Sequence, residues 1–226
     1  MNVTVVKVGG SLTLYPEKLR ALCAKLSESS KNQRLIVVPG GGEFADIVRG
    51  IDERFSLSCS ASHKMAILGM DQYGYLLSDL MPNSITVSKL EEIKYFLDSS
   101  GLPVFLPSNM MLSEDPLENS WAVTSDSIAV YFASRLHVPK VLLVTDVDGV
   151  YTADPKTHSD ARWIKKLTAN ELLAMNKRTS VDAFLPKLLL KSPIDCFVVN
   201  GLFPERVEAI LRGHDAVCTL ITNSFP

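Results

Sequence analysis

The sequence predicts an α/β protein in which helices cover both faces of a mostly parallel sheet. Short, continuous runs of apolar and β-branched residues alternate with helical patterns along the whole chain of 226 residues. Strands that are apolar on both faces are typical of parallel sheets buried between helices. Glycine-rich or aspartate-rich turns follow several of these runs. Because ligands of such sheets bind outside the carboxyl ends of the strands, we expect a ligand site at that edge.

The composition is that of a globular protein with a substantial core. Apolar residues make up 46% of the chain and charged residues 21%, enough for a buried interior and a hydrated surface. Lysine plus arginine (23) nearly balances aspartate plus glutamate (25), so bulk charge argues against a nucleic-acid partner. The length fits one domain and no Pro/Ser-rich linker divides it, so we expect a single domain over residues 1–226.

The sequence also predicts a cytoplasmic protein that does not bind a membrane. It opens directly into a strand-like run, without the basic and apolar segments of a signal peptide. No apolar run is long enough to cross a bilayer. The four cysteines lie far apart without CxxC spacing, which favours reduced thiols over metal or disulfide roles.

The first half of the chain shows the alternation clearly. Apolar residues at i, i+3, i+4 and i+7 from Leu19 to Leu26 predict an amphipathic helix after the first strand. Residues 108–121 are polar and irregular, and we expect a surface loop there. In order, the predicted elements are a strand at 3–8, a helix from residue 16, a strand at 34–38, a helix from the next glycine turn to residue 49, a helix at 61–80, a strand at 85–87, a helix at 89–97 and a strand at 103–106.

The second half repeats the pattern. A polar segment, Thr124-Ser125-Asp126-Ser127, predicts a helix start. Residues 152–166 are predicted to form a polar loop. The remaining predicted elements are a strand at 140–145, helices near 168–176 and 184–191, a strand at 195–199, a helix from Pro204 and a last strand at 216–222.

Two glycine turns follow two of the first strands. They are Gly9-Gly10-Ser11, with Lys7 just upstream, and Gly40-Gly41-Gly42. Successive glycines let backbone N–H groups approach a phosphate, and a following helix adds partial positive charge. One such turn often serves only to reverse the chain, but two of them with a nearby lysine favour phosphate binding. The sequence contains neither the GxxxxGK[ST] P-loop nor the GxGxxG dinucleotide fingerprint.

Four segments together resemble the amino acid kinase family. They are KVGGS (7–11), VPGGG (38–42), TSDSIA (124–129) and TDVDGVY (145–151), in the family's order and roughly its spacing. The resemblance implies a three-layer sandwich around a mostly parallel sheet. It also implies an ATP-dependent kinase that uses Mg²⁺ and acts on a small molecule, with the acceptor bound by the N-terminal part and ATP by the C-terminal part. Phosphoryl transfer needs positioned cations and no nucleophilic side chain.

The resemblance also implies a role for individual residues. Lys7 would contact the transferring phosphoryl group, and Asp126 would organise the lysines, although Asp126 could instead be a helix cap. Lys187 would be a second phosphate-binding lysine, but the usual glycine-rich approach to it is replaced by residues 181–186, so a solvated helix lysine is the alternative. No residue is assigned to a metal. The remaining predicted ATP contacts are Gly9, Gly10, Ser11, Asp146, Asp148, Gly149 and Tyr151.

Four further segments resemble a narrower archaeal subgroup that acts in methanofuran biosynthesis: residues 37–49, 62–77, 184–189 and 199–207. That subgroup phosphorylates [5-(aminomethyl)furan-3-yl]methyl phosphate to the diphosphate. The alternatives are a kinase of another phosphorylated small molecule, such as isopentenyl phosphate or a nucleotide, and a sensor or storage protein that binds a nucleotide without turnover.

The acceptor would then be a small-molecule phosphate that carries an ammonium on a flat ring. Gly40, Gly41 and Gly42 would face it. Glu43 and Asp46, three residues apart on one helix face, could pair with the ammonium, and His63 could meet the phosphate with Lys64. Each of these side chains could equally be a solvated surface group. We also expect a homo-oligomer.

Overall fold

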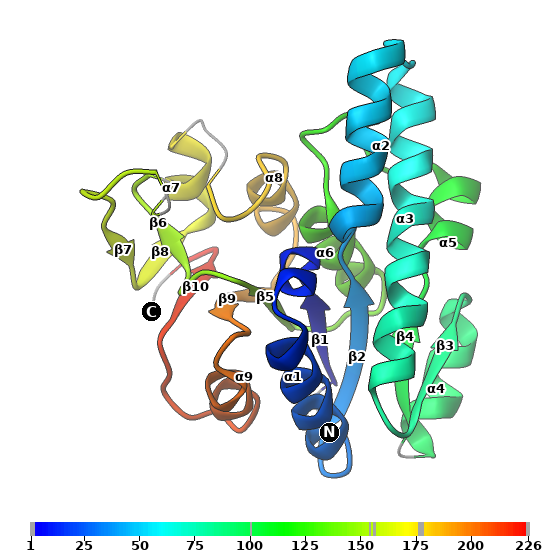
Figure 1. The fold of residues 1–226 in the computed structure, drawn as a ribbon. Coiled ribbons are helices and arrows are strands. Elements are labelled where there is room, and N and C mark those ends of the chain that lie inside the picture. The colour runs from blue at the N-terminus through cyan, green and yellow to red at the C-terminus, as the bar shows by residue number, and fades with distance from the viewer. Residues whose placement is uncertain (1–2, 100, 154, 156, 176–178, 225–226) are drawn as a thin grey trace.

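The computed structural model describes residues 3–99, 101–153, 155, 157–175 and 179–224, and its centre is an eight-stranded sheet (Figure 1). The strand order is β3-β4-β2-β1-β5-β9-β10-β8, which places β1 and β5 in the middle. Two short strands, β6 and β7, form a separate antiparallel pair. The strands are β1 (Val3–Val8), β2 (Arg34–Pro39), β3 (Ser84–Val87), β4 (Leu102–Phe105), β5 (Lys140–Thr145), β6 (Val150–Tyr151), β7 (Trp163–Ile164), β8 (Lys166–Thr168), β9 (Asp195–Asn200) and β10 (Cys218–Thr222).

The predicted mostly parallel sheet is confirmed. Strands β3, β4, β2, β1, β5 and β9 pair in parallel, as do β10 and β8. Among the described strands of this sheet, the one antiparallel pairing is that of β10 with β9. Strands β1, β2 and β5 are buried along most of their length, which explains their continuous apolar sequences. Lys7 lies between Val38 of β2 and Leu143 of β5, near the carboxyl end of the sheet.

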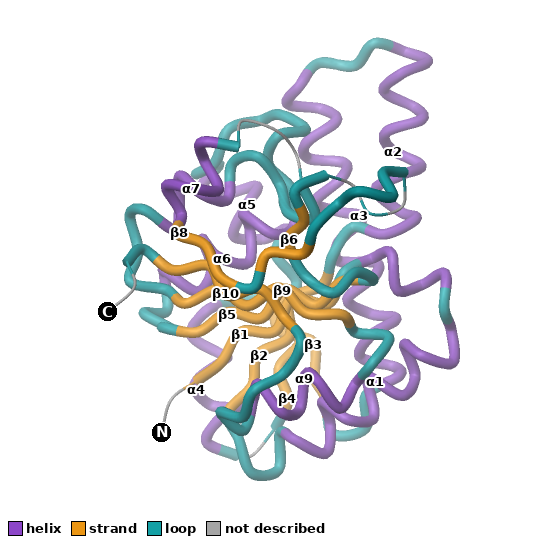
Figure 2. Tube along the Cα trace, turned by 90° about the vertical axis from the view of Figure 1, so that its left-hand side faces the viewer, coloured by secondary structure: helices purple, strands orange, loops and turns teal. Residues whose placement is uncertain are grey.

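Helices cover both faces of the sheet, so the three-layer sandwich is confirmed. Side chains of β1 alternate between two cores: Val5 packs on the side of α6, and Val6 on the side of α1. Figure 2 shows α6 and α1 on opposite sides of the strands. The helices are the 3₁₀ helix η1 (Gly10–Leu14), α1 (Pro16–Ser29), α2 (Gly42–Phe55), α3 (Cys59–Leu80), α4 (Leu90–Asp98), α5 (Ser108–Glu114), α6 (Ser125–Arg135), α7 (Ala169–Ala174), α8 (Leu185–Leu189) and α9 (Pro204–Leu211).

Helices α2 and α3 form an antiparallel hairpin that projects beyond the carboxyl ends of the strands (Figure 1). Gly69 of α3 permits the close approach, because a Cβ there would lie 3.2 Å from Cβ of Phe44 on α2. The C-terminal half of α3 packs into the α1 core through Tyr73 and Leu77. The hairpin therefore forms a wall above one side of the sheet edge where ligands were expected.

Three local predictions were wrong or incomplete. Residues 108–114, predicted to be part of a loop, form α5, because Met110 and Met111 are buried in the core and the Ser108 N–H donates to Asp71 Oδ1 at 3.2 Å. The predicted loop at 152–166 includes β7, which pairs with β6 across the turn. The last strand is antiparallel to β9, a reversal that periodicity alone does not reveal.

Candidate active site

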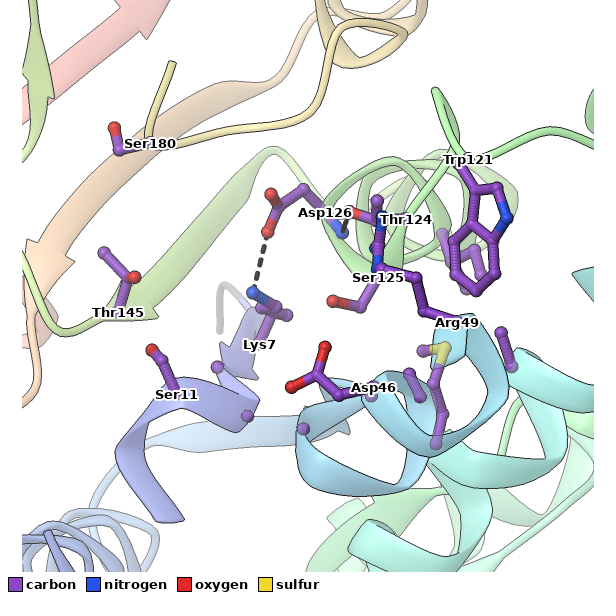
Figure 3. Close-up of a pocket in the computed structure, with 18 of the residues that line it drawn as sticks. Lys7, Ser11, Asp46, Arg49, Trp121, Thr124, Ser125, Asp126, Thr145 and Ser180 are labelled. Atoms are coloured by element: carbon purple, nitrogen blue, oxygen red, sulfur yellow. Dashed lines mark hydrogen bonds and ion pairs between the residues drawn. The ribbon is translucent and has the colours of Figure 1, made fainter. Parts of the chain in front are cut away.

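A cavity of about 670 Å³ opens at the carboxyl ends of β1 and β5. Its lining comes from the start of η1, the α2/α3 hairpin, the segment that enters α6, and the turn after β5. Small-molecule sites in proteins usually occupy between about 300 and 1,000 Å³. In Figure 3, Ser11, Thr145 and Ser180 lie towards one end of the cavity, Arg49 and Trp121 lie towards the other, and Lys7 is between them.

The two glycine turns interlock as a single floor. A Cβ on Gly10 would lie 2.0 Å from Cα of Gly42, and a Cβ on Gly40 would lie 2.7 Å from the backbone nitrogen of Gly10. Gly42 also has a positive φ of 55°. Beneath this floor, the buried Tyr73 hydroxyl donates to the carbonyl of Gly9 at 3.2 Å. Only glycines permit this backbone-to-backbone contact, which fixes one turn against the other.

Lys7 and Asp126 meet at the centre of the cavity. Lys7 Nζ lies 2.8 Å from Asp126 Oδ1, and their side chains are only 9% and 10% exposed (Figure 3). Asp126 stands in the first turn of α6, and its other oxygen, Oδ2, accepts the backbone N–H of Asp182 at 3.3 Å. The ion pair therefore brings together residues that are 119 positions apart in the sequence and joins β1 to α6.

Asp182 holds the start of α6 in place through hydrogen bonds. Its buried carboxylate accepts the backbone N–H and hydroxyl of Thr124, both at 2.9 Å, and those of Ser127 at 3.0 and 2.6 Å. It also accepts the N–H groups of Phe184 and Leu185 at 3.1 and 2.8 Å. Burial, and then the charge of Asp126, raise the pKa of Asp182 above its ordinary value. No motif identified this residue in advance.

One end of the cavity carries the residues predicted to bind the nucleotide. Ser11 Oγ donates to Asp146 Oδ1 at 3.0 Å, which links the turn after β1 to the turn after β5. Tyr151 also lines the cavity, and burial followed by the charge of Asp148 raises the pKa of its phenol. Gly9 and Gly10 complete the floor here. These predicted contacts thus lie together around one end of the cavity.

Asp148 and Gly149 stand behind that end and do not line the cavity. Asp148 Oδ1 accepts from Asn200 Nδ2 at 2.9 Å and from Arg206 Nη1 at 2.6 Å. Gly149 has a φ of 151°, and a Cβ there would lie 2.2 Å from Thr219 Oγ1. Through this packing and ion pairing they support the turn after β5.

The predicted acceptor residues lie on the side of the cavity that α2 and α3 form, and Figure 3 shows Asp46 near its middle, beside Lys7. Gly41, Gly42, Glu43 and Asp46 line the cavity, whereas Gly40 is buried in the floor. The two acids are exposed to solvent. His63 is buried in the wall, and burial lowers its pKa, which favours a neutral imidazole.

Lys187 does not line the cavity that contains Lys7. It is exposed on α8, where its ammonium lies 5.1 Å from the centre of the Phe184 ring. It lines a separate hollow of about 260 Å³ beside α7. A role for Lys187 in phosphate binding stays a prediction.

The charged residues of the cavity show whether its lining is suited to the expected Mg²⁺. Among the described residues, four acids line it (Glu43, Asp46, Asp126 and Asp146) against two permanent cations, Lys7 and Arg49. No group of three or more His, Cys, Asp and Glu side chains suited to a metal occurs in the described part of the chain. Mg²⁺ is usually bound through substrate phosphates and one or two carboxylates, and this lining fits such a metal.

The chain belongs to the amino acid kinase family, because the model of that family matches residues 2–189. The [5-(aminomethyl)furan-3-yl]methyl phosphate kinase of Methanocaldococcus jannaschii is 37% identical over 217 residues, or 96% of each chain. A uridylate kinase of Methanococcoides burtonii is 24% identical and covers 92% of this chain and 91% of its own length. The crystal structure of uridylate kinase from Archaeoglobus fulgidus superposes with a TM-score of 0.76, at 21% identity over 98% of this chain and 100% of that one, and supports the fold.

Proposed function

We propose that the protein is an ATP-dependent kinase that phosphorylates the phosphate group of [5-(aminomethyl)furan-3-yl]methyl phosphate, giving the diphosphate. The observation that carries the proposal is the buried Lys7–Asp126 pair, 2.8 Å apart, at the centre of a cavity between two interlocked glycine turns. The 37% identity to a kinase of that compound over 96% of each chain supports the choice of acceptor. An isoprenoid acceptor would need an apolar tunnel, which the acids Glu43 and Asp46 in the lining disfavour.

In the proposed reaction, an oxygen of the acceptor phosphate forms a bond to the γ-phosphorus of ATP. The bond from that phosphorus to the β–γ bridging oxygen breaks, and its electron pair leaves with ADP. Lys7 stabilises the charge on the migrating group, and Asp126 holds the Lys7 ammonium in place. A phosphomonoester is largely a dianion at neutral pH, so no side chain must remove a proton from the nucleophile. Mg²⁺, when bound, would neutralise the ATP phosphates.

In this proposal, ATP and the acceptor bind to different parts of the cavity. The turn after β1 and the turn after β5 would bind ATP through Gly10, Ser11, Asp146 and Tyr151. The α2/α3 hairpin would bind the acceptor. Among the described residues, no helix is long and apolar enough to cross a membrane. We further propose a cytoplasmic homo-oligomer.

The test is ADP release from ATP and Mg²⁺ with a panel of acceptors: the aminomethylfuran phosphate, isopentenyl phosphate and UMP. We expect turnover that depends on the aminomethylfuran phosphate, with a kcat/KM at least ten-fold above those of the other two. A preference for UMP or isopentenyl phosphate would identify a different kinase. Nucleotide binding without turnover of any acceptor would identify a sensor or storage protein.

A further inference from the structure

Arg49 and Trp121 form a cation–π pair in the wall of the cavity, at the end where we place the acceptor. Both line the cavity, and the Arg49 guanidinium carbon lies 4.3 Å from the centre of the Trp121 ring. The indole N–H donates to Asp52 Oδ2 at 2.7 Å. Asp52 lies one helical turn after Arg49 on α2, so the same helix holds the indole and supplies the guanidinium. Figure 3 shows Arg49 and Trp121 at the end away from Ser180.

The Arg49 guanidinium is a cation without an anionic partner. Across the described residues it makes no hydrogen bond or ion pair with the protein, although Asp46 and Asp52 are on the same helix. The other permanent cation of the lining, Lys7, is already paired with Asp126. His63, with its lowered pKa, does not supply a stable charge at neutral pH.

The cation–π contact determines which part of the guanidinium remains available. The planar group lies over an indole face, an attractive arrangement that holds it without using its N–H donors. Those donors point outward in the plane of the group, where they match two oxygens of a phosphate. A lysine in the same place would offer charge but not the paired donors.

We propose that Arg49, held over the Trp121 ring, binds the phosphate that the acceptor already carries and restricts the enzyme to phosphomonoester acceptors. The inference rests on the proposed function and adds to it the residue that selects the acceptor class. It also meets an electrostatic need of the reaction. The nucleophile is an anion that must approach the anionic γ-phosphate in a cavity with more acids than cations, and Arg49 offsets part of that repulsion.

Steady-state kinetics of Arg49→Ala and Arg49→Lys test the proposal. For Arg49→Ala we expect kcat/KM for the phosphorylated acceptor to fall about 10- to 100-fold, as for loss of a charge-assisted hydrogen bond, while KM for ATP changes less than about two-fold. Arg49→Lys should recover only part of the loss. Arg54→Ala is the matched control, because Arg54 is on the same helix and outside the cavity lining, and donates to the Gly50 carbonyl at 3.0 Å. Equal losses for Arg49→Ala and Arg54→Ala would overturn the proposal.

Trp121 variants test the orienting role. Trp121→Phe keeps a ring under the guanidinium and loses only the bond to Asp52, so we expect a smaller rise in the acceptor KM than for Trp121→Leu. If Arg49 and Trp121 only stabilise the fold, their variants would lower the melting temperature and leave the KM for the acceptor unchanged. That result would overturn the inference.

Calorimetry separates this inference from the proposed function. The ligands are phenyl phosphate and phenol, with ADP and Mg²⁺ present. We expect the wild type to prefer phenyl phosphate at least ten-fold and Arg49→Ala to lose that preference. If the wild type has no preference, or if Arg49→Ala keeps it, the proposal is wrong. If the preference depends on Arg49 but the aminomethylfuran phosphate is not a substrate, only the proposed acceptor is wrong.

Discussion

At the scale of single residues, the Lys7–Asp126 pair is the part of the cavity to which we assign the chemistry. Both side chains are largely buried, so removal of either one would leave the other as an unpaired buried group. Lys7→Ala should lower kcat about 10²–10³-fold, the usual cost of losing one preorganised group in such a site. Asp126→Asn should lower kcat more than it raises the KM for ATP, because Asp126 pairs with the Lys7 ammonium at the centre of the cavity. If Asp126→Asn has unchanged kinetics and a lower melting temperature, Asp126 serves only as a helix cap.

The acids on the acceptor side of the cavity provide a second test at this scale. An ammonium buried without an anion is costly, and Glu43 and Asp46 are the acids of α2 that line the cavity. Glu43→Gln or Asp46→Asn should lower kcat/KM for the aminomethyl acceptor about 10- to 100-fold. The methyl analogue should be a poor substrate of the wild type and nearly indifferent to both substitutions. If both acceptors respond equally, neither acid recognises the amine.

A site residue could be predicted from the sequence only where it belongs to a recognisable motif. Lys7, Ser11 and Asp146 were predicted from strand-end motifs, and the fold brings their turns together. Arg49 and Trp121 were missed, because 72 residues separate them and neither belongs to a phosphate motif. Their partnership arises from tertiary packing of a loop against α2, which periodicity does not encode.

At the scale of elements, one buried carboxylate joins α6 to the turn before α8. Asp182 satisfies six donors from both segments, and its own N–H reaches Asp126. Asp182→Asn would place an amide donor against some of these donors, and each buried donor left unpaired costs about 1–3 kcal/mol. We expect a loss of about 3 kcal/mol or more in the free energy of unfolding, measured by denaturant titration.

The control for that experiment is Asp79→Asn on the exposed face of α3, which should change stability by less than about 0.5 kcal/mol. A similar small effect for Asp182→Asn would contradict the role assigned to the carboxylate. A stable variant with reduced kcat would instead show that the network serves mainly to position Asp126.

The elements themselves were largely predictable, and the exceptions have physical causes. The parallel strands and α3 have strong patterns because both faces of the strands and one long helix face are buried. Helix α5 was missed, since its buried methionines are hidden in a short polar segment. The antiparallel direction of β10 was not predictable either, because strand direction depends on the connection and not on the strand's own sequence.

At the scale of the whole molecule, the cavity lies between the α2/α3 hairpin and the segments around β5 and α6, so ligands should join them and stabilise the fold. A ligand that binds only the folded state at about 100 times its Kd adds about 2.7 kcal/mol. For a chain of this size, that corresponds to a rise in Tm of about 5–10 °C. We expect such a rise in thermal scans with ATP and Mg²⁺.

Removal of the metal should reverse most of the first rise. The four acids among the described lining residues outnumber the two cations, so the ATP phosphates need an added cation to bind well. With EDTA present, the rise in Tm caused by ATP should fall to less than about half of its value with Mg²⁺. Lys7→Ala should also lower it, whereas Arg54→Ala should not, because Arg54 is remote from the lining. An equal rise with EDTA and with Mg²⁺ would mean that the protein binds the nucleotide without a metal, and that Lys7 and the glycine turns neutralise the phosphates by themselves.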